Sequence, residues 1–385
     1  MSTLVLYACS SNSSKTSTTA EKKDSSPIKI AGIFSTSGTG APLGSPEAET
    51  LKMLVDQQNG KGGINGRKIE LISYDEKSDQ NEAVLNMKKA VTQDDVTAVI
   101  GGTLTGNSLA QLPLAEQYQV PYFSVAASQQ VHTKEDGTER KWVFKVTQDD
   151  SQAVEKVLQY LKSKNLTMVA WLNVANSFGT GGHAEFKKMA GKYGVTPVIE
   201  DEFDATVKDA KPMLTRVKKA DPQAIIVWGT VQESSVVIKN IKELEMNLPV
   251  IGSHGIGSQQ LLDLAGDAAN GVLFPSGKLI VANQLPDSDP QKKVLLDYKK
   301  MYEDKYHKPV SLFGAHTFDS FNMLKQAIEK KGTDKAAIRD YLENDIHNFV
   351  ATNAVFNNSP KTHDGQTPDS MVMVKIENKK WTIDK

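Results

Sequence analysis

The chain has 385 residues, of which 39% are hydrophobic and 24% charged. These values are typical of a globular protein long enough for two domains, and they exclude disordered and collagen-like classes. The formal net charge is −1, with Lys and Arg spread along the chain, so no basic stripe is available to bind nucleic acid. Cys9 is the only cysteine, which excludes a disulfide framework and any metal site built from several cysteines.

The first 27 residues differ from the rest of the chain in composition. The segment Leu6-Tyr7-Ala8-Cys9 resembles a bacterial lipobox, in which the cysteine receives lipid after signal cleavage. Only eight residues precede Cys9, fewer than a complete signal needs, so we interpret residues 1–9 as the remnant of a lipoprotein signal. The alternative is a stray N-terminal thiol. Residues 10–27 have no apolar periodicity and predict a flexible tether, and no later segment reaches the ~20 apolar residues of a membrane span.

Strands and helices are predicted to alternate after the tether. Four short runs rich in Ile, Val, Phe and Tyr alternate with amphipathic stretches of helical length, which predicts a parallel sheet with helices on both faces. A second series of the same kind begins near residue 167. The predicted strands of the first series are residues 29–35, 68–75, 96–102 and 120–126, and those of the second are 167–173, 196–203, 224–230 and 249–253.

The remaining segments predict how two α/β lobes are joined. Residues 142–150 lie between the two series, where we expect the chain to cross from one lobe to the other. Two long helical patterns follow residue 290, and the chain ends in a predicted hairpin with residues 377–379 at its turn. We therefore predict lobe 1 from residues 28–146 with 277–350, and lobe 2 from residues 147–276 with 351–385.

Two strand ends carry small polar residues. Residues 96–102 lead into Thr103 to Ser108 and then into a helical pattern, and residues 120–126 lead into Ala126 to Ser128. Open α/β sheets bind ligands beyond the carboxyl ends of their strands, and the N–H groups that begin a helix hold small anions. The sequence therefore predicts a grip on a small polar ligand with a carboxylate, in a cleft between the lobes.

Motifs that would support catalysis are absent from the sequence. The seven histidines are scattered without HExxH spacing, and neither GxSxG nor GxxxxGK[ST] occurs. Residues 252–258 (GSHGIGS) lack the dinucleotide pattern GxGxxG. We therefore expect a binding protein that is not an enzyme and has neither a cofactor nor a metal.

Several short segments occur here in a specific combination. They are residues 37–44 (SGTGAPLG), 61–66 (KGGING), 73–76, 100–102, 120–124, 177–181 and 252–255. In this combination the chain closely resembles the leucine/isoleucine/valine-binding proteins of ABC importers, from about residue 27 to its end. The resemblance implies a type I periplasmic-binding fold, with two Rossmann-like lobes joined by a multi-strand hinge.

The resemblance also implies a set of ligand contacts. Thr105 stands where the family holds the ligand carboxylate, Ala126 where a carbonyl takes the ammonium, and Ser128 where a hydroxyl contacts both charged ends. Three further positions replace aromatic residues of the family and would reshape the side-chain pocket. They are Phe178, which keeps the ring of a tyrosine without its hydroxyl, Thr230 and Leu43.

His254 is the sharpest departure from the family pattern. Relatives that bind amino acids usually carry a glutamate here to pair with the α-ammonium, and a buried ammonium without an anionic partner is costly. Either the ligand is a carboxylate without an α-ammonium, or the ammonium is met by carbonyls and another acid. Asp75 and Asp319 are the candidates for that acid, with helix capping or contacts between lobes as the competing interpretation for both.

The resemblance implies the substrate-binding lipoprotein of an ABC importer. It would capture a small hydrophobic amino acid or related monocarboxylate by hinge closure and deliver it to a membrane permease. We expect a monomer outside the cytoplasm, anchored by lipid to the outer face of the cytoplasmic membrane or periplasmic. The alternatives are a receptor that senses aromatic or other organic acids for a signalling protein, and an enzyme on the same scaffold.

Overall fold

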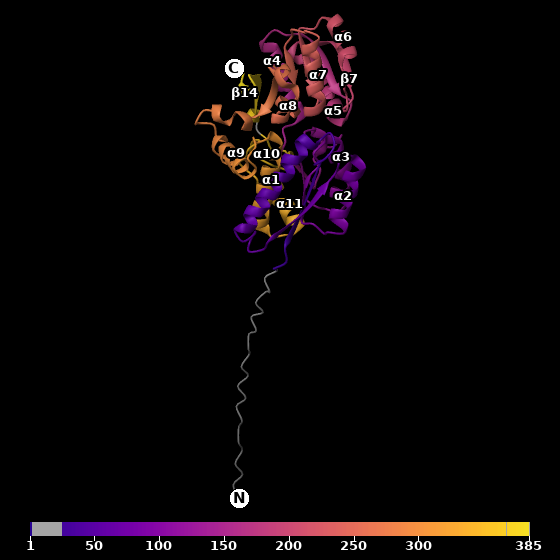
Figure 1. The fold of residues 1–385 in the computed structure, drawn as a ribbon. Helices are drawn as coiled ribbons and strands as arrows, with labels where there is room; N and C mark the ends of the chain where they lie inside the picture. The colour runs from indigo at the N-terminus through magenta and orange to yellow at the C-terminus, as the bar shows by residue number, and fades with distance from the viewer. Residues whose placement is uncertain (2–24, 367, 385) are drawn as a thin grey trace.

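The computed structural model describes residue 1 and residues 25–366 and 368–384. Two α/β lobes stack on one another, as Figure 1 shows with the N-terminal part of the described chain in the lower lobe. The predicted lipidation site Cys9, and the predicted tether up to residue 24, lie outside the described residues. No helix in the described part of the chain is both long and apolar enough to cross a membrane.

The sheet of lobe 1 is fully parallel, in the order β2-β1-β3-β4-β5. Its strands are β1 (Ile28–Phe34), β2 (Ile69–Asp75), β3 (Ala98–Gly101), β4 (Tyr122–Ser124) and β5 (Val143–Lys145). The helices between them are α1 (Ala41–Gly60), α2 (Gln80–Thr92) and α3 (Thr105–Gln117).

Both faces of this first sheet are covered. Alternate residues of β1 enter different hydrophobic clusters, with Ile28 and Ile30 on the side of α1 and α10, and Ala31 and Ile33 on the side of α2 and α3. Successive side chains of a strand point to opposite faces, so a strand that is apolar at every position requires cover on both. The predicted parallel sheet with helices on both faces is confirmed for this lobe.

The sheet of lobe 2 has the order β14-β13-β10-β9-β8-β6-β7, and only its last two strands in sequence, β13 and β14, are antiparallel to their neighbours. Its strands are β6 (Met168–Val174), β7 (Thr196–Phe203), β8 (Ala224–Trp228), β9 (Val250–Gly252), β10 (Leu273–Gly277), β13 (Met371–Glu377) and β14 (Lys380–Ile383). Its helices are α4 (Asp150–Ser163), α5 (Ser177–Met189), α6 (Lys211–Ala220), α7 (Val231–Glu243) and α8 (Gln259–Ala265).

The predicted C-terminal hairpin is confirmed. β13 and β14 pair through Glu377 and Lys380, and the turn residues Asn378 and Lys379 have φ values of 50° and 60°. Two consecutive positive φ angles are what a tight hairpin turn requires, and asparagine adopts them readily.

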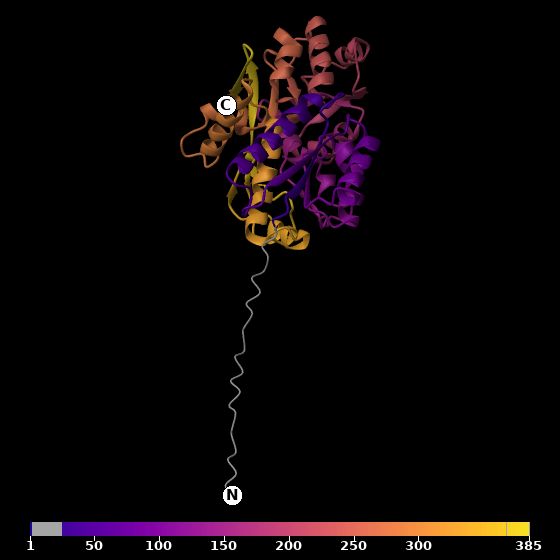
Figure 2. The same ribbon diagram turned by 60° about the horizontal axis from the view of Figure 1, so that its bottom comes forward.

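Three longer helices follow the second lobe's parallel strands: α9 (Lys292–Tyr306), α10 (Leu312–Lys331) and α11 (Lys335–Asn344). Helix α10 lies along α1, and Figure 2 shows this C-terminal part of the chain beside the N-terminal lobe. Gly314 permits the close approach, since a Cβ there would lie 2.7 Å from Thr50 Oγ1 and 3.1 Å from the carbonyl oxygen of Pro46, both in α1. The short helices are η1 (Gln129–Val131), η2 (Ala190–Tyr193), η3 (His254–Ile256), η4 (Gly266–Ala269), η5 (Lys278–Gln284) and η6 (Pro368–Ser370).

The chain returns to lobe 2 later than predicted. A small antiparallel pair, β11 (Phe349–Val350) and β12 (Val355–Phe356), follows α11. Ala351, Ala354 and Phe356 are buried in the hydrophobic cluster of lobe 1, beside β1 and α10. The predicted division at residue 350 therefore precedes the crossing, because the chain joins the second sheet only at Met371.

Candidate ligand-binding site

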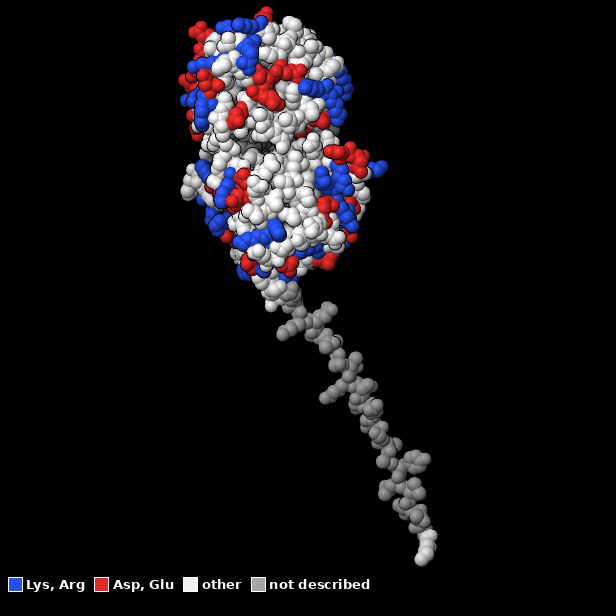
Figure 3. All heavy atoms as spheres, turned by 90° about the vertical axis from the view of Figure 1, so that its right-hand side faces the viewer, with Lys and Arg blue, Asp and Glu red and all other residues white. Residues whose placement is uncertain are grey.

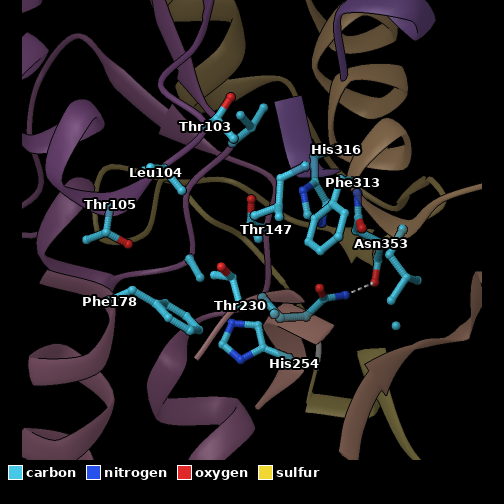
Figure 4. A pocket seen from close by; sticks show the side chains of 17 residues that line it. Thr103, Leu104, Thr105, Thr147, Phe178, Thr230, His254, Phe313, His316 and Asn353 are labelled. Atoms are coloured by element: carbon cyan, nitrogen blue, oxygen red, sulfur yellow. Dashed lines mark hydrogen bonds between the residues drawn. The ribbon is translucent and has the colours of Figure 1, made fainter. Parts of the chain in front are cut away.

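A small cavity lies between the lobes, with about 50 Å³ of space inside it for water-sized molecules. Figure 3 shows a hollow between the lobes on a face whose rim carries few charged side chains, and Figure 4 shows the residues that line the cavity. The lining residues are Leu43, Thr103, Leu104, Thr105, Val125, Ala127, Thr147, Gln148, Phe178, Thr230, His254, Gly255, Gly277, Leu312, Phe313, His316 and Asn353.

Helix α3 of lobe 1 begins at the cavity wall. Thr105 is the first residue of α3, directly after strand β3 and its turn, and it is 4% exposed. Its N-cap residue, Leu104, offers no side chain to the free N–H groups of the first turn. Those groups and the positive end of the helix dipole favour an anion, so this wall suits a carboxylate.

Aromatic rings form the wall from lobe 2. Phe178 near the start of α5 and His254 in η3 lie with their ring centroids 5.4 Å apart. Trp228 is fully buried behind them, stacked on Phe178 at 6.0 Å and edge-on to His254 at 5.7 Å. The packing of three rings fixes the positions of Phe178 and His254, while Trp228 stays in the core.

Two histidines from opposite lobes line the cavity. His254 comes from lobe 2, and His316 comes from α10, which packs on lobe 1. Burial, and then the charge of Lys145, lower the pKa of His254 to about 3. Burial, and then the nearness of His254, lower the pKa of His316 to about 3 as well. Both imidazoles are therefore neutral at pH 7.

No Asp, Glu, Lys or Arg is among the described residues that line the cavity. Two buried acids of lobe 1 stand behind Thr103, whose hydroxyl donates to Glu47 at 2.6 Å and whose N–H donates to Glu76 at 3.0 Å. Burial raises the pKa of Glu47, and it raises the pKa of Glu76 to about 7. The cavity itself therefore offers hydroxyl, amide and imidazole groups on apolar walls.

A charged network lies behind the hinge side of the cavity. The Lys145 ammonium pairs with Asp149 and donates to the carbonyls of Thr147 at 2.6 Å and Ala127 at 3.4 Å. Burial alone would raise the pKa of Asp149, but Lys145 and His132 outweigh it and hold that pKa well below its ordinary value. The network thus supports two residues of the cavity wall, Ala127 and Thr147.

His132, Asp149 and Asp364 lie close enough to hold a metal ion. The ring of His132 is already bonded to Glu139 at 2.9 Å and to Asp149 at 3.4 Å. Burial would lower the pKa of His132, but hydrogen bonds to these two carboxylates raise it to about 9. A protonated imidazole does not bind a metal, so the cluster fits an ion-pair network better.

Four of the six predicted ligand contacts lie in the cavity wall: Thr105, Phe178, Thr230 and His254, together with Leu43 at the start of α1. The hydroxyl of Thr230 is engaged elsewhere, because it donates to Glu233 at 2.9 Å in the capping box of α7. Thr230 therefore offers the cavity little beyond its methyl group and backbone.

Ala126 and Ser128 are not among the lining residues. Ala127 lies between them and does line the cavity. Ser128 accepts a hydrogen bond from the N–H of Gln130 at 3.3 Å and faces a neighbouring groove that also contains Asp150. The structure therefore gives Ser128 a role at the start of η1.

The two acids considered as ammonium partners also lie outside the cavity wall. Asp75 accepts from the N–H groups of Thr36 and Lys77, near the surface. Asp319 is buried and accepts from the N–H groups of Thr352 and Asn353. Both carboxylates hold loops, so these contacts match neither an ammonium partner nor the helix cap or contact between lobes that the sequence suggested.

Several lining residues were missed from the sequence. Thr147 and Gln148 directly follow β5, so the rule that points to strand ends could have found them. Leu312, Phe313 and His316 lie in the first turns of α10, where only a histidine within an apolar helical pattern gave a signal. Asn353 lies in the loop between β11 and β12, and nothing in its surroundings marked it.

The cleft lies between two α/β lobes and is lined by residues of both lobes. This arrangement defines a two-lobed binding protein. Residues 27–380 match the model of a family described as periplasmic binding protein. The leucine-, isoleucine-, valine-, threonine- and alanine-binding protein of Pseudomonas aeruginosa is 25% identical over 311 residues, covering 79% of each chain. This chain belongs to the leucine/isoleucine/valine-binding protein family of periplasmic binding proteins.

Solved structures confirm the type I fold. An extracellular ligand-binding receptor from Rhodopseudomonas palustris HaA2 superposes with a TM-score of 0.85 at 24% identity, covering 93% of this chain and 100% of its own. LivJ of Streptococcus pneumoniae, a branched-chain amino acid transporter substrate-binding protein in complex with isoleucine, gives a TM-score of 0.79 at 24% identity, covering 92% and 97%.

Proposed function

We propose that this protein is the substrate-binding component of an ABC importer. It captures a small hydrophobic amino acid of the branched-chain type, or a related monocarboxylate, between its lobes and delivers it to a membrane permease. The observation that carries the proposal is the largely apolar cavity whose wall combines Thr105 of lobe 1 with Phe178 and His254 of lobe 2. A ligand that touches both walls favours the closed form, so binding drives closure without chemistry.

The family relatives support this function. Proteins that share about a quarter of their residues with this chain are named for binding leucine, isoleucine and valine. We propose an extracytoplasmic location, with lipid attached at Cys9 as the anchor and the chain acting as a monomer. The support for the anchor is the sequence Leu6-Tyr7-Ala8-Cys9.

Thermal unfolding of the purified protein with a panel of amino acids, 2-oxo acids and aromatic acids tests the proposal. A ligand at about 100 times its Kd adds about 2.7 kcal/mol to the free energy of unfolding, enough to raise the midpoint by several degrees. Small-angle scattering with the same ligand should show a smaller radius of gyration. If no member of the panel changes the midpoint, the proposal is wrong.

Thr105→Ala should weaken binding by about 1–3 kcal/mol, because a charged carboxylate would lose a hydrogen bond at the start of α3. Isothermal titration calorimetry with the tightest ligand of the panel measures the change. Thr215→Ala is the matched control, since this hydroxyl is exposed on α6 and donates to the carbonyl of Lys211 in its own helix. Equal affinity of the two variants would remove Thr105 from the site.

A further inference from the structure

We propose that the ligand is a hydroxylated monocarboxylate without an ammonium group, whose hydroxyl is bound by His254 and His316 together. The inference rests on the proposed function and names the substrate class for the same cavity. It also assigns a specificity role to His316, a residue that the predicted set of contacts did not contain.

Three buried ring nitrogens carry the proposal. Nδ1 and Nε2 of His254, and Nδ1 of His316, are buried without a hydrogen-bond partner among the described residues. His254 is 8% exposed and His316 is 6% exposed, and both rings line the cavity. Figure 4 shows the two rings on different sides of the pocket, with Thr105 well apart from His316. Buried polar atoms that lack partners are costly, so the cavity should bind a group that satisfies them.

The chemistry of neutral imidazole selects that group. Each neutral ring carries one N–H donor and one bare nitrogen acceptor, so His254 alone presents both kinds of unpaired atom. A hydroxyl donates and accepts at the same time, whereas a carbonyl only accepts and a methyl group does neither. The branched aliphatic side chains of leucine, isoleucine and valine would leave all three nitrogens unpaired.

An ammonium fits this cavity poorly. No carboxylate is among its described lining residues, and the buried acids behind the wall are engaged by Thr103, Thr230 and Asn353. Lys145 behind the wall adds positive charge near His254, although Asp149 pairs with it. An ammonium buried without an anionic partner is strongly unfavourable, whereas a carboxylate still has the start of α3.

Two matched pairs of acids and one amino acid test the proposal by calorimetry on the full chain. The pairs are 4-hydroxybenzoate with benzoate, and 4-hydroxyphenylacetate with phenylacetate, whose hydroxyls lie at the end opposite the carboxylate, and the amino acid is leucine. We expect the hydroxylated member of at least one pair to bind about tenfold or more tighter than its partner, and tighter than leucine, because it satisfies buried donors and acceptors.

Variants then assign the effect to the two rings. His254→Leu and His316→Leu should each reduce the ratio between the affinity for the hydroxylated acid and the affinity for its partner, whereas His347→Leu, at an exposed site, should leave that ratio unchanged. Removing an unpaired buried polar group should leave the unfolding midpoint unchanged or raise it, which checks that the variants fold.

The possible outcomes separate this proposal from the proposed function. If both members of each pair bind alike, or leucine binds tighter than either hydroxy acid, the hydroxyl selectivity is wrong and the binding function stands. If variants at both histidines keep the full selectivity, the assignment to His254 and His316 is wrong. If none of the five compounds binds, both the hydroxyl selectivity and the proposed binding function are wrong.

Discussion

Lys145→Met should destabilise the protein by about 3–5 kcal/mol, the largest single effect we expect. Lys145 is 1% exposed, and its ammonium pairs with Asp149 and donates to the carbonyl of Thr147. Removing one partner of a buried ion pair leaves the other charge buried and uncompensated. Urea unfolding followed by circular dichroism measures the loss as a lower midpoint.

Two further variants distinguish the effect of the stranded Asp149 charge from a general effect of replacing a lysine. Lys52→Met removes an exposed lysine paired with Asp56 on α1, and it should cost no more than about 0.5 kcal/mol. Adding Asp149→Asn to Lys145→Met removes the stranded charge but keeps an N-cap acceptor for α4, so the double variant should recover about 1 kcal/mol or more. A loss below about 1 kcal/mol for Lys145→Met alone would contradict the network.

The fold could be predicted because its strands are distinctive. β3 and β8 are short runs buried at every position, the pattern of a parallel strand covered on both faces. The edge strand β7 alternates between exposed and half-buried residues, and it was still identified from its length and its proline and β-branched residues. The return of the chain to lobe 2 was misplaced, because the apolar residues around Phe356 could enter the core of either lobe.

The lining residues that follow strands could be predicted from the sequence, whereas most of the other lining residues could not. Thr105 and His254 each follow a parallel strand of their own lobe, so local pattern finds them. His316 reaches the cavity only because α10 (Leu312–Lys331) packs against α1 (Ala41–Gly60), a helix far away along the chain. Thr230 illustrates the opposite error, since its hydroxyl is used within its own helix cap. Local sequence cannot show which polar atoms remain unpaired after packing.

Ligand affinity should fall on acidification below about pH 6.5, since closure would bury two histidines in neutral form. His254 and His316 have pKa values of about 3 in this structure, where both rings are buried, against about 6.5 for an imidazole in water. A pKa that is lowered on closure favours the closed form above pH 6.5, and this advantage is lost as the pH falls toward 3. At about pH 5.5 each histidine should cost about tenfold in affinity, and the two together about 100-fold.

Other titratable groups around the cavity modify this expectation. Lys145 and Asp149 lie near His254, and Asp149 stays ionised over this range because its pKa is held well below its ordinary value. Burial raises the pKa of Asp319 to about 6, but Asp319 itself does not line the cavity and is held by Thr352 and the lining residue Asn353, so it should titrate alike with the cleft open or closed.

Asp150 acts in the opposite direction. Burial, and then the charge of Asp149, raise its pKa to about 6, and it lines the groove beside the cavity. If closure buries Asp150, that acid takes up a proton and offsets the histidines by a few fold at about pH 5.5. We therefore expect a net loss of about 30-fold to 100-fold between about pH 8 and about pH 5.5.

Calorimetry across this range, with the tightest acid of the two matched pairs, measures the pH dependence while the ligand stays ionised. His316→Leu should reduce the loss to about tenfold, because one titrating ring remains, and His347→Leu should leave the profile unchanged. An affinity that stays constant down to about pH 5.5 would mean that the two histidines are not buried by binding. The same measurement therefore tests closure over the ligand, because only a cleft that excludes water lowers both pKa values.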